Sequence, residues 1–422
     1  MKTRFSIRRL VTTTSHAWLV LSLTAALLLI APLAHPQPAE AQKFAELAKV
    51  PPLGWNSWNR YGCNIDEKTV MRQADAMVSS GLKAAGYRYI VIDDCWHGER
   101  DKDGLIQPHP QHFSNGMKKL ADYVHAKGLS LGIYSDAGGK TCGGMPGSRG
   151  REYQDALTYA RWGIDYLKYD WCHADDLNAP AAYRTMSEAL RAAGRPVVFS
   201  VCEWGQNEPW KWAGPLAHLW RTTGDITACF DCIVDHGTWK SWGVLQILDK
   251  QEGLRRYAGP GRYNDPDMLE VGNGMTAAED RAHFSMWAML SAPLIAGNDL
   301  ASMSKETLSV LANGEVIRVD QDPLVIQAFR YLSLGDLEVW FKPLDKGELA
   351  VAFLNRGKAV QSISFDWAEH GTNDDQSHRR LDFKTQTYRV RDLWAQRDLG
   401  TTQTPLAGSV AAHDVWMLRL RP

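Results

Sequence analysis

The chain has 422 residues, enough for two or three domains, of which 45% are hydrophobic and 23% charged. Lys and Arg number 47 against 48 Asp and Glu, so the formal net charge is only -1 and the basic excess typical of nucleic-acid binders is absent. With 17 Trp, 14 Tyr and 11 Phe, the chain is also too aromatic for a disordered protein. The composition therefore indicates a folded globular protein without a nucleic-acid partner.

Residues 1–41 are predicted to be a secretory signal peptide. Basic residues, among them Lys2 and Arg4, precede an apolar run from Ala17 to Ala31, and Ala39 and Ala41 supply the small side chains of a cleavage site. The apolar run is shorter than the roughly 20 residues of a spanning helix, which makes an uncleaved membrane anchor the weaker alternative. We expect export to the periplasm or the outside, with no membrane attachment after cleavage.

Short apolar stretches alternate with amphipathic ones from about residue 53 to residue 300. We expect strands at 87–92, 129–134, 164–169 and 196–201, and helices at 67–82, 116–126, 151–162 and 181–193. This alternation predicts parallel βα units, and its length suits an α/β (β/α)8 TIM barrel, placed at residues 42–325. An open doubly wound sheet is the alternative, but residues 54–58 lack the glycine-rich phosphate turn that such a sheet would carry after its first strand.

The pattern changes to short strands and turns after residue 325. Residues 337–342 and 349–354 flank a turn at Asp345, Lys346 and Gly347, which is typical of a hairpin. Further strands are expected at 388–393 and 415–420. We therefore predict a C-terminal antiparallel β-sandwich domain over residues 326–422.

Four predicted barrel strands end in acidic residues, namely Asp93 with Asp94, Asp136, Asp170 and Glu203. Because the C-terminal ends of barrel strands meet at one mouth, we expect these carboxylates to converge. Aromatic residues are expected at the same mouth, namely Trp58, Trp96, Tyr134 and Trp204. An isolated strand-end Asp is as readily a helix cap or a surface residue, but acids interleaved with aromatic rings favour a sugar, which offers hydroxyls to carboxylates and a C–H face to rings.

Lys168 and Asp170 are two residues apart in one strand and so lie on the same face. We expect the Lys168 ammonium to hold Asp170 ionised and its pKa low, as a nucleophile requires, with a purely structural ion pair as the alternative. A retaining glycosidase also needs a second carboxyl group about 5 to 5.5 Å away. The strand pattern alone does not identify that second group.

Eight blocks of the chain occur in the order found in one enzyme family. They are residues 53–58, 89–96, 131–136, 140–143, 166–172, 200–205, 220–226 and 264–269, from Leu-Gly-Trp-Asn-Ser-Trp to Asn-Asp-Pro-Asp-Met-Leu. In these blocks the chain resembles glycoside hydrolase family 27, the α-galactosidase family. The resemblance implies a (β/α)8 barrel followed by an antiparallel β domain, and no metal or organic cofactor.

The resemblance also implies the catalytic pair. The family's nucleophile falls on Asp170 in Tyr-Leu-Lys-Tyr-Asp, and its acid/base falls on Asp225 in Arg-Thr-Thr-Gly-Asp rather than on Asp231. By the same resemblance Asp93 and Asp94 hold the C4 and C6 hydroxyls of the sugar. These assignments imply galactose rather than glucose in the pocket.

Further residues of the substrate pocket follow from the resemblance. It implies that Lys168 and Arg221 bind hydroxyls and that Glu203 and Trp204 form the wall that faces the sugar's C2 position. The remaining pocket residues it implies are Trp58, Tyr134, Cys142 and Met268.

Seven cysteines follow the predicted cleavage site, so at least one thiol is expected to stay unpaired. The resemblance implies two disulfides near the rim of the pocket, Cys63 with Cys95 and Cys142 with Cys172, and leaves Cys202 without an evident partner. Cys229 and Cys232 suit a local disulfide or two free thiols better than a zinc or redox site, since no second half of such a site is present.

The sequence therefore predicts a retaining exo-α-galactosidase whose partner is an α-galactoside carbohydrate. The alternatives in the same family are a β-L-arabinopyranosidase and an α-N-acetylgalactosaminidase. A catalytically inactive galactose-binding protein is the alternative from another class. The sequence does not predict the leaving group or the oligomeric state.

Overall fold

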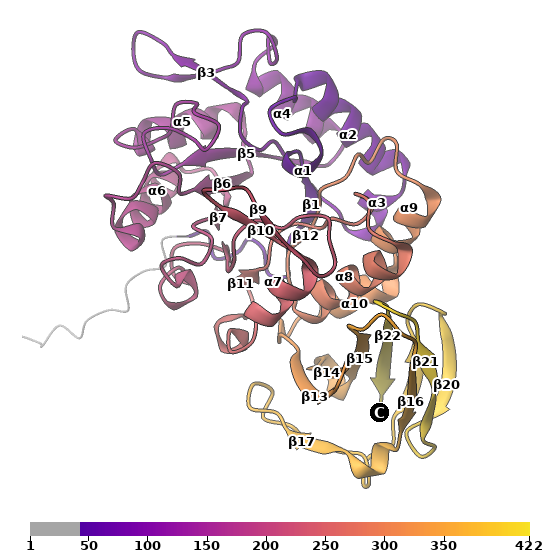
Figure 1. Ribbon diagram of the computed structural model, residues 1–422. Coiled ribbons are helices and arrows are strands. Elements are labelled where there is room, and N and C mark those ends of the chain that lie inside the picture. The colour runs from indigo at the N-terminus through magenta and orange to yellow at the C-terminus, as the bar shows by residue number, and fades with distance from the viewer. Residues whose placement is uncertain (1–42) are drawn as a thin grey trace, which may run out of the picture. The chain divides into compact units, whose positions relative to one another are not determined.

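Eight parallel strands form the first part of the chain in the computed structural model, which describes residues 43–422 (Figure 1). The predicted signal peptide lies outside the described residues. The strands are β1 (Leu53–Asn56), β2 (Tyr89–Val91), β5 (Ser130–Asp136), β6 (Tyr166–Asp170), β7 (Val198–Val201), β8 (Leu219–Arg221), β11 (Tyr263–Asp265) and β12 (Leu294–Ala296). From β1 to β11 each strand pairs in parallel with the next one in this order, and β1 also pairs in parallel with β12.

The sheet closes on itself just after β11. Leu269 forms a parallel bridge with Ala296, and its N–H donates to the carbonyl oxygen of Ile295 at 2.7 Å. An open doubly wound sheet would have free edges here, so the closure confirms the predicted barrel. The carboxyl ends of all eight strands consequently open at one mouth.

Helices cover the outside of the barrel, as Figure 1 shows. They are α1 (Trp58–Tyr61), α2 (Glu67–Ser79), α3 (Leu82–Ala85), α4 (Met117–Ala126), α5 (Glu152–Trp162), α6 (Ala179–Ala193), α7 (Val244–Lys250), α8 (Ala277–Met289), α9 (Lys305–Leu311) and α10 (Gly314–Asp320). The predicted helix over 67–82 is in fact two helices, because Gly81 adopts a positive φ of 90° that ends the first. At its start, the Asp66 carboxylate caps α2 by accepting from the Thr69 N–H at 2.7 Å.

Two antiparallel hairpins interrupt the barrel pattern. One pairs β3 (His97–Arg100) with β4 (Ile106–Pro108), and the other pairs β9 (Ile233–Asp235) with β10 (Lys240–Trp242). The second hairpin starts just after Asp225, whose carbonyl oxygen accepts from the Trp242 N–H at 2.9 Å. These strands of three or four residues are too short and polar to be predicted from periodicity.

The second part of the chain, residues 329–421, is antiparallel and is called the β domain below. Its main sheet has the order β13 (Phe329–Leu334), β14 (Leu337–Pro343), β15 (Leu349–Asn355), β22 (Val415–Arg421), β19 (Arg389–Asp392) and β20 (Arg397–Thr401). Two smaller sheets pair β16 (Gln361–Phe365) with β21 (Leu406–Val410) and β17 (Gly371–Asn373) with β18 (Arg380–Asp382). Apolar side chains of the main sheet, such as Phe341 and Phe353, pack in one core with Phe365 and Leu406 of the smaller pair. This arrangement confirms the predicted antiparallel domain.

Lys342 joins the β domain to the barrel. Its side chain is fully buried, and its Nζ donates to the Ala288 carbonyl oxygen, Ser291 Oγ and the Val319 carbonyl oxygen at 2.7 to 2.8 Å. Ala288 lies in the last turn of α8, where a cation compensates the partial negative charge of the helix end. The three bonds fix the main sheet against this helix.

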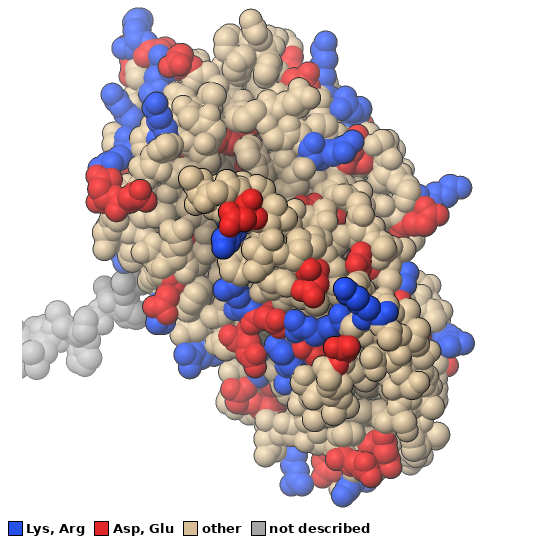
Figure 2. Space-filling view, in the orientation of Figure 1, with Lys and Arg blue, Asp and Glu red and all other residues tan. Residues whose placement is uncertain are grey.

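Ion pairs line the edge of the same junction. Asp249 of α7 accepts from both Arg330 and Arg356, and Glu338 of β14 accepts from Arg356 at 2.8 Å. Figure 2 shows blue and red side chains interspersed along this boundary. Within residues 43–422 no helix has both the length and the apolar character that a bilayer crossing demands.

Candidate active site

A small cavity opens where the barrel strands end. Acidic, basic, aromatic and sulfur-containing side chains from the ends of β1, β2, β5, β6, β7, β8 and β11 surround it. Its lining residues are Trp58, Asn59, Asp93, Asp94, Tyr134, Cys142, Lys168, Asp170, Trp204, Arg221, Asp225, Asp267 and Met268. The structure thus brings together every predicted catalytic and substrate-binding residue except Glu203.

Asp170 lies at the end of β6 and is almost completely buried, with Oδ1 accepting from the Trp171 N–H at 3.0 Å. Burial raises the pKa of its carboxyl group to about 7, while the positive charge of Lys168 opposes this rise and the negative charge of Asp225 adds to it. The expectation that Lys168 holds this pKa low is therefore wrong, because desolvation outweighs the ammonium.

Lys168 makes its direct ion pair with a different carboxylate. Its Nζ lies 2.8 Å from Asp93 Oδ2, which also accepts from Asn56 Nδ2 at 2.7 Å. The ammonium lies 5.3 Å from the ring centroid of Tyr134. Lys168 therefore stands between Asp93 and Asp170 and supplies positive charge to both.

Asp225 differs from Asp170 in exposure, since its side chain is 38% exposed. It follows β8, and Arg221 of that strand donates through Nη2 to Asp225 Oδ1 at 3.0 Å. The same Nη2 lies 2.9 Å from Asp267 Oδ2, which also accepts from the Ile226 N–H at 2.8 Å. One buried guanidinium thus positions two carboxylates at the mouth, one of which is open to solvent.

Asp94 is held by the backbone on both sides. Its Oδ1 accepts from the Cys95 N–H at 2.6 Å and its Oδ2 from the Gly143 N–H at 2.7 Å, while burial raises the pKa of the carboxyl group. These bonds fix the carboxylate in the cavity wall and leave each oxygen with further acceptor capacity. Asp93 and Asp94 can therefore accept neighbouring hydroxyl groups of one ligand.

Backbone strain is concentrated at this mouth. Trp204 and Asp267 both line the cavity with left-handed φ values of 58° and 88°, and Cys95 beside Asp94 has a φ of 74°. Non-glycine residues adopt such angles at a cost of about 1 to 3 kcal/mol each, and they do so mainly at functional sites. The strain is consistent with a mouth arranged for a ligand.

Two disulfides stand near the cavity, as the sequence analysis expected. Cys142 is bonded to Cys172, and Cys63 is bonded to Cys95. Cys142 also lines the cavity, where its Sγ accepts from the Tyr134 hydroxyl at 3.3 Å.

The other three cysteines lie outside these pairs. Cys229 and Cys232 are bonded to each other, whereas Cys202 is a buried free thiol. Asp136 lies close to the sulfur atoms of Cys142 and Cys172, but those sulfurs are already bonded to each other and so are not available to a metal.

Glu203 is the one predicted pocket residue that does not line the cavity. It is fully buried, and its Oε2 accepts from the backbone and side-chain nitrogens of Asn207 at 2.5 and 2.8 Å. Its other oxygen has no hydrogen-bond partner within residues 43–422, and burial raises the pKa of the carboxyl group to about 7. Direct contact between Glu203 and a sugar therefore stays a prediction.

Two residues that line the cavity were not assigned a role from the sequence. Asn59 follows Trp58, and Asp267 precedes Met268 inside a quoted block, so the spacing of that block was the available signal for Asp267. Asp136, which was expected to converge with the other strand-end acids, ends β5 near Asp170 but does not line the cavity, and its Oδ2 accepts from the Cys172 N–H at 2.9 Å. Burial and the charge of Asp170 raise the pKa of Asp136 to about 8, so this carboxyl group can stay protonated beside the site.

Comparison with known proteins gives two family matches. Residues 50–322 match the family model described as alpha galactosidase A, and residues 334–420 match that of the alpha galactosidase C-terminal beta sandwich domain. The chain is 59% identical over 384 residues to α-galactosidase A from Cellvibrio japonicus, with 91% of this chain and 95% of that protein covered.

Solved structures resemble the chain over most of its length. The crystal structure of α-galactosidase I from Mortierella vinacea has a TM-score of 0.83 and 37% identity, covering 89% of this chain and 98% of that one. The structure of α-galactosidase from Saccharomyces cerevisiae with raffinose has a TM-score of 0.82 and 31% identity, covering 91% and 100%.

Proposed function

The chain belongs to the α-galactosidase A family, glycoside hydrolase family 27, and from this premise we propose that it is a retaining exo-α-galactosidase. One observation carries the proposal: Asp170 and Asp225 line the same small cavity in different environments. Asp170 is buried near the positive charges of Lys168 and Arg221, whereas Asp225 is partly exposed and bonded to Arg221. A double displacement needs two carboxyl groups with different roles of this kind.

In the first step a carboxylate oxygen of Asp170 attacks C1 of the galactosyl residue. The C1–O bond to the leaving group breaks, and Asp225 gives its proton to the departing oxygen. In the second step Asp225 takes a proton from water, whose oxygen attacks C1 and displaces Asp170. The product is galactose with its α configuration retained.

The cavity wall supports selection of a galactosyl residue. Asp93 and Asp94 offer acceptors to two hydroxyls, which we assign to C4 and C6, and Lys168 donates from the same side. Trp58 and Tyr134 supply ring surface, and Trp204 narrows the side assigned to C2. A bulky indole on that side of the cavity leaves little room for an acetamido group. A second carboxylate that binds the C6 hydroxyl favours a galactoside over an arabinoside, which lacks that hydroxymethyl group.

The substrate we propose is a terminal α-galactosyl group of an oligosaccharide of the raffinose type. This assignment rests on the raffinose named for the yeast structure and on the enclosed cavity, which suits a chain end. We also propose that the enzyme is exported, with 42–325 as the catalytic barrel and 326–422 as a β-sandwich domain. The disulfides of the described chain support an oxidising compartment.

The stereochemistry of azide rescue tests both catalytic roles. With Asp170→Ala, azide should replace the missing nucleophile and give β-galactosyl azide from an activated aryl α-galactoside. With Asp225→Ala, azide should intercept the galactosyl-enzyme and give α-galactosyl azide. The same variant should lose about 10²- to 10⁴-fold of its activity on raffinose, whose leaving group needs protonation, and much less on the aryl galactoside.

Asp231→Ala is the matched control, because Asp231 bonds to Gln246 and does not line the cavity. It should retain wild-type rates and give no azide product. Equal losses on raffinose and the aryl galactoside with Asp225→Ala would contradict the acid/base assignment. Binding of galactose without turnover by the wild type would instead identify a galactose-binding protein.

A further inference from the structure

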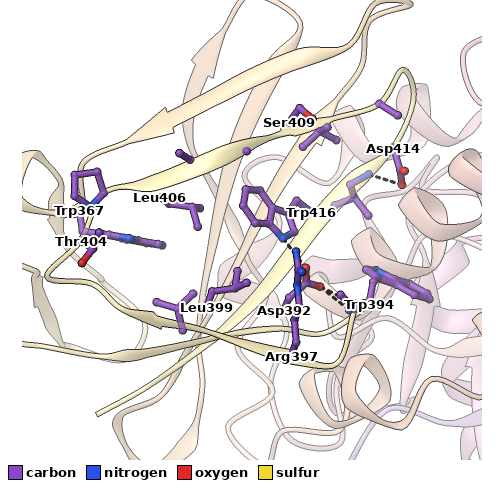
Figure 3. Close-up of a pocket in the computed structure, with 18 of the residues that line it drawn as sticks. Trp367, Asp392, Trp394, Arg397, Leu399, Thr404, Leu406, Ser409, Asp414 and Trp416 are labelled. Carbon is purple, nitrogen blue, oxygen red and sulfur yellow. Dashed lines mark hydrogen bonds between the residues drawn. The ribbon is translucent and has the colours of Figure 1, made fainter.

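A second cavity of about 620 Å³ lies in the β domain and shares no residue with the cavity that holds Asp170. It is bounded by β19, β20, β21 and β22, and Figure 3 shows Trp416 between the strands that carry Leu399 and Leu406. Its volume falls within the roughly 300–1,000 Å³ of small-molecule sites. The catalytic mechanism gives it no role.

Trp416 of β22 forms a fixed aromatic surface in this cavity. A Cβ added at Gly408 would stand 2.7 Å from Trp416 Cζ3, so the absence of a side chain lets the indole lie directly against β21. Phe353 packs nearby, with ring centroids 6.2 Å apart. Trp416 nevertheless remains only partly buried, so part of its ring is open to the cavity.

Asp392 sets the orientation of this ring. Its Oδ2 accepts from Trp416 Nε1 at 2.9 Å, and its Oδ1 accepts from the N–H groups of Trp394 and Ala395 at 3.0 and 2.9 Å. The indole N–H is thereby satisfied inside the protein, so the ring offers a ligand its apolar surface. The buried carboxylate is itself occupied and adds no free negative charge to the cavity.

The rim of the cavity is polar and almost neutral. Arg281 and Asp414 neutralise each other through Nη2 and Oδ2 at 2.5 Å. Arg397 is exposed and makes no ion pair within residues 43–422, and the hydroxyls of Thr404 and Ser409 have no partner there. A free guanidinium and the free hydroxyl of Thr404 suit a ligand rich in hydroxyl groups, whereas a polyanion would require several cations.

We propose that this cavity is a non-catalytic binding site for a neutral saccharide chain. The pyranose C–H face stacks on Trp416, and its hydroxyls bond to Arg397 and Thr404. An apolar ring of fixed orientation surrounded by unpaired donors and acceptors is the arrangement that sugar recognition needs. The site would hold the enzyme on a saccharide chain while the barrel removes galactosyl groups.

Affinity electrophoresis through gels containing soluble galactomannan or unbranched glucomannan tests the proposal. The full chain is used with Asp170→Ala, so that the polymer is not degraded, and glucomannan offers the catalytic cavity no α-galactosyl end. We expect at least one of the two polymers to slow the protein. Trp416→Ala should weaken that retardation about tenfold, as expected for loss of a central aromatic anchor.

Two further variants guard against a folding artefact. Thr404→Tyr fills the cavity from an exposed rim position and should weaken retardation without lowering the melting temperature, whereas Tyr153→Ala removes an exposed aromatic residue of α5 and should change nothing. In the otherwise wild-type chain, Trp416→Ala should keep its turnover of an aryl α-galactoside.

The outcomes separate this proposal from the catalytic one. Retardation by neither polymer, or equal retardation of Trp416→Ala and its parent, would overturn the saccharide site even if aryl galactosides are hydrolysed. Retardation in gels that contain acidic polygalacturonate, without retardation by either neutral polymer, would also overturn the saccharide site. Binding of a β-strand peptide in the cavity in place of a saccharide would overturn it as well. Loss of aryl galactoside turnover in the wild type would concern only the proposed catalytic function.

Discussion

Replacing Lys168 by Met should shift the acidic limb of the pH–activity profile to higher pH. The proposed nucleophile, Asp170, must be ionised to attack, and burial already raises its pKa to about 7. Lys168 opposes that rise, so its removal leaves burial and the charge of Asp225 unbalanced. Activity should therefore require a higher pH than in the wild type.

The size of the shift follows from the charge that is lost. An opposite charge within about 4 to 6 Å changes a carboxyl pKa by about 1 to 3 units. If the pKa of Asp170 rises from about 7 to about 8, its ionised fraction at pH 6 falls from roughly 10% to roughly 1%. kcat/KM at pH 6 should then drop about tenfold from this cause alone.

Lys168→Met also removes the partner of buried Asp93, which should cost about 3 to 5 kcal/mol of stability. The assay is kcat/KM for an aryl α-galactoside between pH 4 and 9, together with thermal unfolding at each pH. The position of the limb isolates the effect on Asp170, because misplacement of Asp93 lowers rates at every pH.

Two controls accompany this variant. Lys168→Arg keeps the positive charge and should keep the limb close to its wild-type position. Lys118→Met removes an exposed lysine that is paired with Asp122 on α4. It should change neither kcat/KM nor the pH at which the acidic limb falls. An acidic limb at the wild-type pH in Lys168→Met would refute the electrostatic reasoning.

Two further variants test the junction and the pocket. Lys342→Met leaves three buried acceptors without their donor and should lower the free energy of unfolding by about 2 to 5 kcal/mol. A melting temperature equal to that of the exposed-site control Lys384→Met would contradict this role. Trp204→Ala should raise kcat/KM for an aryl α-N-acetylgalactosaminide relative to the α-galactoside by about 10- to 200-fold, because it enlarges the side assigned to C2. An unchanged ratio of the two rates would show that Trp204 does not form that wall.

Most of the architecture could be predicted from the sequence because buried parallel strands give continuous apolar runs. The acids that follow β2 and that end β5 and β6 lie at the carboxyl ends of the strands, as the barrel topology predicted. Side-chain pairing was harder to predict, because Lys168 shares a strand face with Asp170 but makes its ion pair with Asp93, which follows β2. Periodicity gives the face on which a residue lies, and it does not choose among partners that the fold brings to that face.

The pKa of Asp170 was wrongly predicted for a related reason. Sequence proximity identified the neighbouring ammonium, but the dominant contribution is desolvation, which depends on how completely the folded chain excludes water. The cavity of the β domain was also not foreseen, since β20, β21 and β22 bring Arg397, Gly408 and Trp416 together only through the sheet arrangement.

Completing the proposed catalytic cavity requires oxidation of Cys142 and Cys172 to a disulfide as well as folding of the chain. Cys142 forms part of the cavity wall, and its partner follows Asp170 by only two residues. A newly made chain in a reducing compartment would carry two thiols there and would lack this cross-link beside the nucleophile. For the exported enzyme proposed above, oxidation of these two thiols after translocation would complete the wall of the pocket.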